Sequence, residues 1–91
     1  MVVTISGIVF DNVDYDSEGD VLYLHIGSPR TAVDFDASPE GHHTRYDAQG
    51  RLVGLTILNA RLLLEEDGKI VVTLADRRLE TSDLGDALAA A

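Results

Sequence analysis

The sequence predicts a mainly β fold of the α+β type, an antiparallel sheet of β-hairpins with a short C-terminal helix. Three observations predict it. Several short stretches alternate between apolar and polar residues, as half-buried strands do. Turn-forming residues, chiefly Gly, Asp and Ser, stand between these stretches. No long crossover segment, which parallel strands require, separates them.

The length and composition predict a single domain spanning residues 1–91. A chain of 91 residues is expected to bury only about 64% of its unfolded surface, which leaves its stability marginal. It contains no cysteine, so neither disulfides nor thiolate-bound zinc can stabilise it. We therefore expect a homodimer, in which a second chain buries additional apolar surface. Because small secreted domains usually carry disulfides, we also expect a cytoplasmic location.

The chain is strongly acidic. Its 16 Asp and Glu residues against 7 Lys and Arg give a net charge of −9, which repels nucleic-acid phosphates and anionic lipids. The N-terminal segment lacks the basic start of a signal peptide and the unbroken apolar stretch of a membrane span. We expect no direct binding of nucleic acid or membrane, and a basic protein as the partner.

A first hairpin is predicted near the N-terminal third of the chain. Residues 20–26 alternate, which places the two leucines and Ile26 on one face of a strand. A shorter strand over residues 13–16 precedes it. The turn between the two strands contains Gly19, which we expect to supply the positive φ.

A second hairpin follows. Residues 31–36 first form a half-exposed strand, with two apolar residues on one face and two aspartates opposite. Residues 43–47 are then predicted to pair with residues 51–58 across a turn that contains Gly50. The expected core consists of Leu22, Leu24, Ile26, Val33, Phe35, Leu55 and Ile57.

The two hairpins share one pattern within a repeat-like core over residues 12–59. Tyr15-Asp16-x-x-Gly19 recurs as Tyr46-Asp47-x-x-Gly50, and apolar strand residues follow at the same offset in both copies. These motifs resemble the bacterial and archaeal family called domain of unknown function 2283, over residues 15–60. The resemblance implies no established activity and no catalytic residues. It makes an antitoxin-like role, beside toxin-like genes, one candidate.

The C-terminal third is predicted from weaker signals. Residues 60–75 form either a third hairpin or a helical turn. We predict the hairpin, because Asp67-Gly68 between apolar runs is typical of a tight turn and residues 70–74 are β-branched. Beyond it, Thr81-Ser82-Asp83 is a good N-cap and predicts a helix over residues 82–90.

The strand expected at Leu52–Leu58 is apolar on both of its faces. Residues 53, 55 and 57 share one face, and residues 52, 56 and 58 share the other. One short helix cannot cover both faces of a sheet, so a further layer is needed. A symmetric partner is the commonest way to supply it, which again predicts a homodimer.

One segment resembles a calcium-binding loop. Asp14-x-Asp16-x-Glu18-Gly19 has the alternating carboxylates and the glycine of an EF-hand loop. The twelfth position should be a bidentate glutamate, and it is His25. The flanking segments also read as strands, so we predict a solvated acidic turn.

The pair His42-His43 is the other candidate for metal binding. Neighbouring residues of an extended chain point to opposite faces, so both imidazoles cannot easily bind one ion, and a third ligand such as Asp36 or Glu40 would be required. We predict a surface loop pair and assign no residue as a metal ligand.

No catalytic apparatus is predicted. Ser28, Asp34 and His25 or His43 are the residue types of a hydrolytic triad, but no nucleophile elbow or glycine-rich phosphate loop accompanies them. We assign no catalytic residue and no cofactor. The sequence thus favours a protein-interaction module, with a small-ligand or metal-binding domain that uses the loop around His42 and His43 as the alternative.

Overall fold

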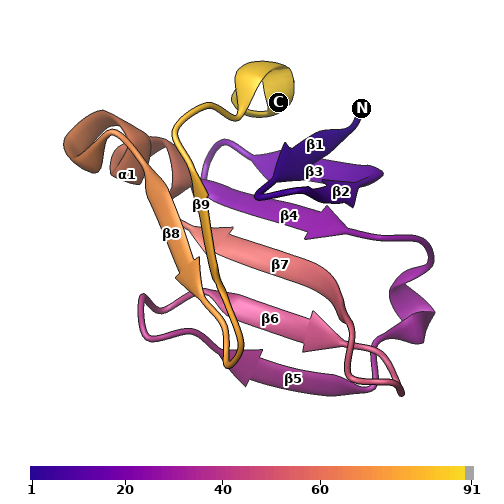
Figure 1. Cartoon of the computed structure of the whole chain (residues 1–91). Coiled ribbons are helices and arrows are strands. Elements are labelled where there is room, and N and C mark those ends of the chain that lie inside the picture. The colour runs from indigo at the N-terminus through magenta and orange to yellow at the C-terminus, as the bar shows by residue number, and fades with distance from the viewer. Residues whose placement is uncertain (90–91) are drawn as a thin grey trace.

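The computed structural model describes residues 1–89, and its largest element is a five-stranded antiparallel sheet (Figure 1). The strand order is β3-β4-β7-β6-β5, so β7 lies at the centre. The mainly antiparallel β prediction is therefore confirmed. The strands are β3 (Asn12–Asp16), β4 (Val21–His25), β5 (Asp34–Ala37), β6 (His43–Tyr46) and β7 (Leu52–Leu58).

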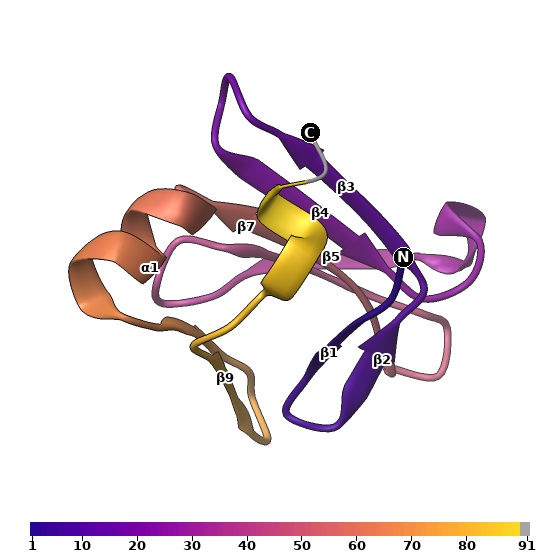
Figure 2. The same cartoon turned by 90° about the horizontal axis from the view of Figure 1, so that it is seen from above.

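Two small hairpins cover one face of this sheet. They are β1 (Val3–Ile5) with β2 (Ile8–Phe10), and β8 (Ile70–Thr73) with β9 (Arg78–Thr81). Figure 2 shows both on the same side of the sheet, together with the 3-10 helix η2 (Gly85–Leu88). A second 3-10 turn, η1 (Pro29–Thr31), lies between β4 and β5. The hydrophobic core fills the space between the sheet and these elements.

The core confirms four of the seven expected residues. Leu22, Leu24, Leu55 and Ile57 are fully buried. They pack against apolar side chains from the small hairpins, namely Val3, Ile5, Phe10, Ile70, Val72 and Leu79. Apolar residues from four separate segments thus form one continuous cluster.

The other three expected core residues were wrong or only half right. Val33 is 54% exposed, Phe35 is 72% exposed, and Ile26 is half-buried. The register explains Phe35: it pairs with Arg45, which pairs with Gly54, and this row lies on the uncovered face. β5 is also one of the two edge strands of the sheet, which limits how much of its surface neighbouring strands can cover.

The predicted hairpin over residues 60–75 is corrected by a helix, α1 (Ala60–Asp67). Gly68 ends it in the left-handed conformation (φ 73°), and its amide donates to the carbonyl of Leu64 at 3.1 Å. An Asp-Gly pair suits a helix C-terminus as well as a tight turn, and the preceding leucines and glutamates are good helix formers. β8 is a strand as expected, but it pairs with β9.

The predicted C-terminal helix over residues 82–90 is also corrected. Thr81 still belongs to β9, and up to residue 89 only one 3-10 turn, η2, follows it. Ala90 lies outside the described residues. The helical turn begins later than predicted because the Thr81 hydroxyl donates to the carbonyl of Asp83 and forms a local turn there. Between residues 1 and 89 no helix is long and apolar enough to cross a membrane.

The turn of the first hairpin differs from the expectation. The positive φ belongs to Asp20 (54°) and not to Gly19, whereas Gly50 takes a positive φ (78°) in the second hairpin as predicted. Contacts with α1 explain the choice of Asp20. Its carbonyl accepts the amide of Ala60 at 3.2 Å, and its carboxylate accepts that of Arg61 at 2.8 Å.

The repeated sequence pattern corresponds to a structural symmetry. Leu24 and Leu55, equivalent residues of the two hairpins, pair directly across β4 and β7. An approximate two-fold axis normal to the sheet therefore passes between them. Equivalent residues lie on opposite sides of this axis at similar distances, as do Asp14 in β3 and Arg45 in β6.

Candidate interaction face

The face of the five-stranded sheet that points away from the small hairpins is covered by no other element of residues 1–89. We call it the outer face. Two rows of side chains cross it, each running over all five strands. They are Asn12, His25, Gly54, Arg45 and Phe35, and beside them Asp14, Tyr23, Thr56, His43 and Ala37.

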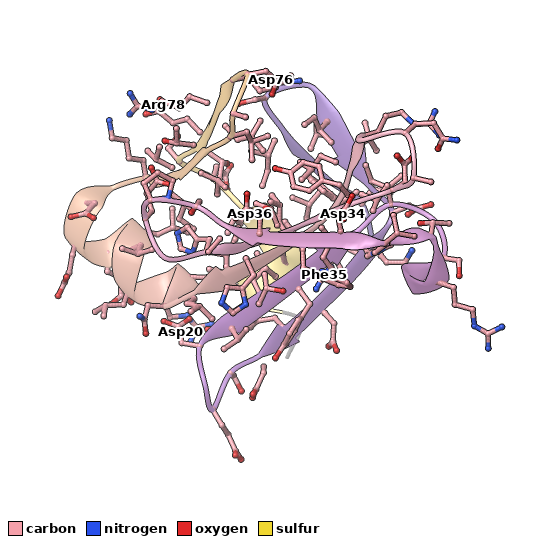
Figure 3. All side chains as sticks on the ribbon, turned by 90° about the horizontal axis from the view of Figure 1, so that it is seen from below. Asp20, Asp34, Phe35, Asp36, Asp76 and Arg78 are labelled. Atoms are coloured by element: carbon pink, nitrogen blue, oxygen red, sulfur yellow. The ribbon has the colours of Figure 1, made fainter. Side chains whose placement is uncertain are left out.

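Aromatic side chains stand exposed on the outer face. Phe35 is 72% exposed and Tyr23 is 42% exposed. Figure 3 shows Phe35 on one side of the β5 ribbon, with Asp34 and Asp36 on the other. Between the aromatic rings lies a hollow of about 370 Å³, lined by Asn12, Val13, Asp14, Tyr23, His25, Ala32, Phe35 and Arg45.

Arg45 lies flat across the middle of this face. Its guanidinium donates to the hydroxyl of Thr56 at 3.1 Å and to the carbonyl of Leu24 at 3.3 Å. Its Nε has no hydrogen-bond partner, and no carboxylate of the described chain lies within ion-pair distance of it. A Cβ at Gly54 would collide with the guanidinium. A glycine inside an apolar strand is the sequence signal for such a close approach.

His25 is the second unsatisfied group of the outer face. Only 7% of it is exposed, and neither ring nitrogen has a hydrogen-bond partner among residues 1–89. Burying an imidazole without partners costs free energy, because its bonds to water are lost. An apolar side chain at position 25 would avoid this cost.

A second hollow lies on the opposite side of β5. It has a volume of about 530 Å³, and its walls come from the β5–β6 region and from the turn between β8 and β9. The carboxylates of Asp36 and Asp76 border it, and in the part of the chain that is described neither has a cationic partner. We call this hollow the acidic groove.

The two neighbouring histidines point to opposite faces, as expected, but the predicted surface loop pair is wrong, because His42 is buried and His43 is the first residue of β6. His42 is buried, and its Nδ1 accepts the amide of Leu58 at 3.1 Å. Burial lowers the pKa of His42, while the charge of Glu40 opposes the shift. His43 is exposed on the outer face. Since Nδ1 of His42 accepts this bond, only Nε2 is left for a ligand of the alternative, small-ligand or metal-binding function.

The two residues named as additional metal ligands have other contacts. The Glu40 carboxylate accepts the amide of Thr73 at 2.9 Å and its hydroxyl at 2.6 Å. Desolvation raises the pKa of Glu40, but hydrogen bonds, chiefly these two, outweigh it and lower that pKa to about 2. Asp36 accepts the amide of Ala37 at 2.8 Å. Nowhere in residues 1–89 do three His, Asp or Glu side chains gather as a metal site would need.

The calcium-like segment and the triad residues are likewise explained by local structure. Asp16 accepts the amides of Glu18 at 3.1 Å and Gly19 at 3.4 Å, which makes it the acceptor of the turn. The Ser28 hydroxyl accepts the amide of Arg30. Because neither nitrogen of His25 has a partner among the described residues, no Ser-His-Asp relay is formed there.

Comparison with known proteins gives one match. The sequence model of a family described as protein of unknown function (DUF2283) matches residues 12–61. This segment begins with β3, contains the whole five-stranded sheet and ends at the second residue of α1. The resemblance carried by the two hairpin patterns is thereby confirmed. No curated protein and no solved structure matches the chain.

Proposed function

The chain belongs to the DUF2283 family of proteins of unknown function, and we propose that it is a non-catalytic protein-interaction module that docks through the outer face. One observation supports this most strongly. The uncovered face of the five-stranded sheet combines exposed aromatic rings, Phe35 and Tyr23, with a guanidinium, Arg45, that lacks a carboxylate partner in the described chain.

The composition of this face suits protein recognition. Tyr, Phe and Arg are enriched in the centres of protein interfaces and supply much of the binding energy. A docked partner would cover Phe35, which is 72% exposed, and would offer an acceptor to Arg45. The partner would also exclude the remaining water around His25, which is only 7% exposed.

Substitution of Phe35 tests this proposal. We expect affinity purification with tagged Phe35→Ser protein to lose a protein that the wild type retains, whether that protein is another chain or a second copy. Leu62→Ser is the matched control, because Leu62 is 43% exposed on α1, away from the outer face. Equal retention by all three proteins in quantitative mass spectrometry would contradict the proposal.

A second partner is proposed for the acidic groove. Its carboxylates have no cationic partner in the described chain, and the net charge is −9. A basic protein would be attracted to this side and would gain ion pairs with Asp36 and Asp76. The outer face would remain free for its own partner.

Salt dependence and charge removal test the basic partner. We expect the affinity of the basic partner to fall as the salt concentration rises. Electrostatic attraction steers the encounter, and salt screens that attraction, within about 8 Å at physiological ionic strength. The double variant Asp36→Asn with Asp76→Asn should weaken binding more than Glu65→Asn with Glu66→Asn, which removes the same charge from α1. Affinity that is equal in both variants and flat with salt would exclude an electrostatic groove.

A further inference from the structure

The hollow of the outer face is lined by two side chains of opposite charge. Asp14 of β3 and Arg45 of β6 both border this space of about 370 Å³. Asp14 is exposed, and in residues 1–89 its carboxylate has neither a hydrogen-bond nor an ion-pair partner. Arg45 has no carboxylate partner in the same part of the chain. The hollow therefore holds one anion and one cation that the described chain leaves unpaired.

Arg45 still has a hydrogen-bond donor to offer. Its Nη2 donates to the carbonyls of Leu24 at 3.3 Å and Leu55 at 3.4 Å, and its Nη1 donates to the hydroxyl of Thr56 at 3.1 Å. A guanidinium has five N–H groups, so these bonds leave the buried Nε–H and one N–H of Nη1. The three bonds hold the guanidinium over the centre of the sheet, and the remaining Nη1 donor suits a carboxylate.

The other walls of the hollow are largely apolar. They include the rings of Tyr23 and Phe35, both exposed, and the half-buried Ala32. His25 also lines the hollow, buried and without a partner for either ring nitrogen in residues 1–89. Costly features of this kind concentrate at functional sites. A concave, mostly apolar space with a few polar groups is typical of a small-ligand site, and this volume suits a small ligand.

We propose that this hollow binds a small zwitterion, an α-amino acid with an apolar side chain. The carboxylate of the ligand lies against Arg45, and its ammonium group lies against Asp14. The apolar side chain of the ligand packs against the exposed rings of Tyr23 and Phe35. This inference goes beyond the proposed function, because it concerns a small molecule and requires no protein partner.

The charges of the hollow favour a zwitterion over an ion of either sign. A plain carboxylate would meet Arg45, but Asp14 and the net charge of −9 would repel it. A plain amine would meet Asp14, but Arg45 would repel it and would stay without a carboxylate. A molecule that carries both groups makes both contacts and brings no net charge.

Titration with matched ligands tests this selection. We expect phenylalanine to cause saturable NMR shifts at the amides of Tyr23 and His25 in the isotope-labelled protein, with a dissociation constant of about 1 mM or below. Hydrocinnamate, which lacks the amino group, and phenethylamine, which lacks the carboxylate, should each bind at least about tenfold more weakly. Leucine serves as a second amino acid with a smaller apolar side chain.

The variant Asp14→Asn separates recognition from a structural role. Phenylalanine should bind it at least about tenfold more weakly, whereas hydrocinnamate should bind it more tightly than the wild type, because the repelling charge is gone. A structural defect would weaken both ligands alike. Glu66→Gln removes the same charge from α1 and should leave both affinities unchanged. Asp14 is exposed and has no partner in residues 1–89, so we expect the variant to fold.

Any one of four results would overturn the proposal. They are no saturable shift with phenylalanine or leucine up to about 20 mM, well above the expected dissociation constant, shifts confined to residues away from the hollow, an analogue that binds as tightly as phenylalanine, or equal effects of Asp14→Asn and Glu66→Gln. The titrations use the protein alone. Their failure leaves the proposed function to the Phe35→Ser purification, so the two failures are distinguishable.

Discussion

At the scale of single residues, Asp20 connects two parts of the chain that are distant in sequence. Its carboxylate accepts the amides of Arg61 at 2.8 Å and Leu62 at 3.1 Å, and the hydroxyl of Tyr15 at 2.7 Å. Asn59, the residue before α1, makes no side-chain cap bond. Figure 3 shows Asp20 beside this helix. Asp20 therefore caps a helix whose second residue, Arg61, lies 41 residues later along the sequence.

The first prediction concerns this cap. Desolvation would raise the pKa of Asp20, but the bonds from Arg61, Tyr15 and Leu62 outweigh it and lower that pKa. Asp20→Ala removes all of these bonds, so we expect the free energy of unfolding to fall by about 1–2 kcal/mol, the usual cost of losing a cap. Urea titration measures it. Glu18→Ala, in the same turn, serves as the control and should have little effect.

The second prediction concerns His42. Burial lowers its pKa in the folded protein, so the unfolded chain binds the proton first. Stability should therefore decline as the pH falls through about 6.5, the ordinary histidine value. His42→Asn keeps an acceptor for the amide of Leu58 and removes the titration, so its stability should change less between about pH 8 and about pH 5. His43→Asn removes only the smallest of the influences on the pKa of His42 and should therefore change this slope less than His42→Asn does.

At the scale of elements, β7 is the strand on which the sheet depends. It pairs with β4 on one side and β6 on the other. Leu55 and Ile57 point into the core and are fully buried. Thr56, on the outer face, is buried as well, because Arg45 lies across this part of the strand. Both faces of β7 are thus occupied, as its apolar sequence indicated, but by different kinds of neighbour.

Leu55 supplies the prediction for this element. It pairs with Leu24 at the centre of the two-fold arrangement and is fully buried. Leu55→Ala should lower the free energy of unfolding by about 2–5 kcal/mol, through lost burial and the cavity that is left. Val33→Ala, at a position 54% exposed, should change it by less than about 0.5 kcal/mol. Thermal melts that shift equally for both variants would contradict the core assignment.

At the scale of the whole molecule, the segments outside the family match supply the cover over the sheet. β1, β2, β8 and β9 all lie outside residues 12–61. They bring Phe10 and Leu79, both fully buried, against the leucines of the central strands. The accessible surface of 5264 Å² is close to the roughly 5,200 Å² that a compact monomer of this mass has. One face is therefore well packed within a single chain.

Phe10 tests whether this cover is essential. It is fully buried, so Phe10→Ala should lower the free energy of unfolding by about 3–5 kcal/mol, as much as Leu55→Ala does. Val9→Ala, one residue away and 51% exposed, is the control. If the N-terminal hairpin were an accessory, the melting temperature of Phe10→Ala would stay at the wild-type value.

The sequence by itself determined the two hairpins and their order. Alternation over neighbouring residues and a turn residue between two strands are local signals, and both strands of each hairpin lie close together in the chain. The repeated Tyr15 and Tyr46 patterns indicated the equivalence that the sheet then shows as a two-fold arrangement. Local signals failed at Asp67-Gly68, because the same pair suits a helix end and a hairpin turn.

Only the tertiary structure decided which face of the sheet is covered. Alternation of apolar and polar residues shows that the two faces of a strand differ. It does not show which of the two faces the other elements of the fold will cover. Phe35 was therefore placed in the core, although its register puts it beside Arg45 on the outer face. The cap by Asp20 and the approach of Arg45 to Gly54 likewise join distant residues. Such contacts exist only when packing brings separate segments together, so no local pattern of residues encodes them.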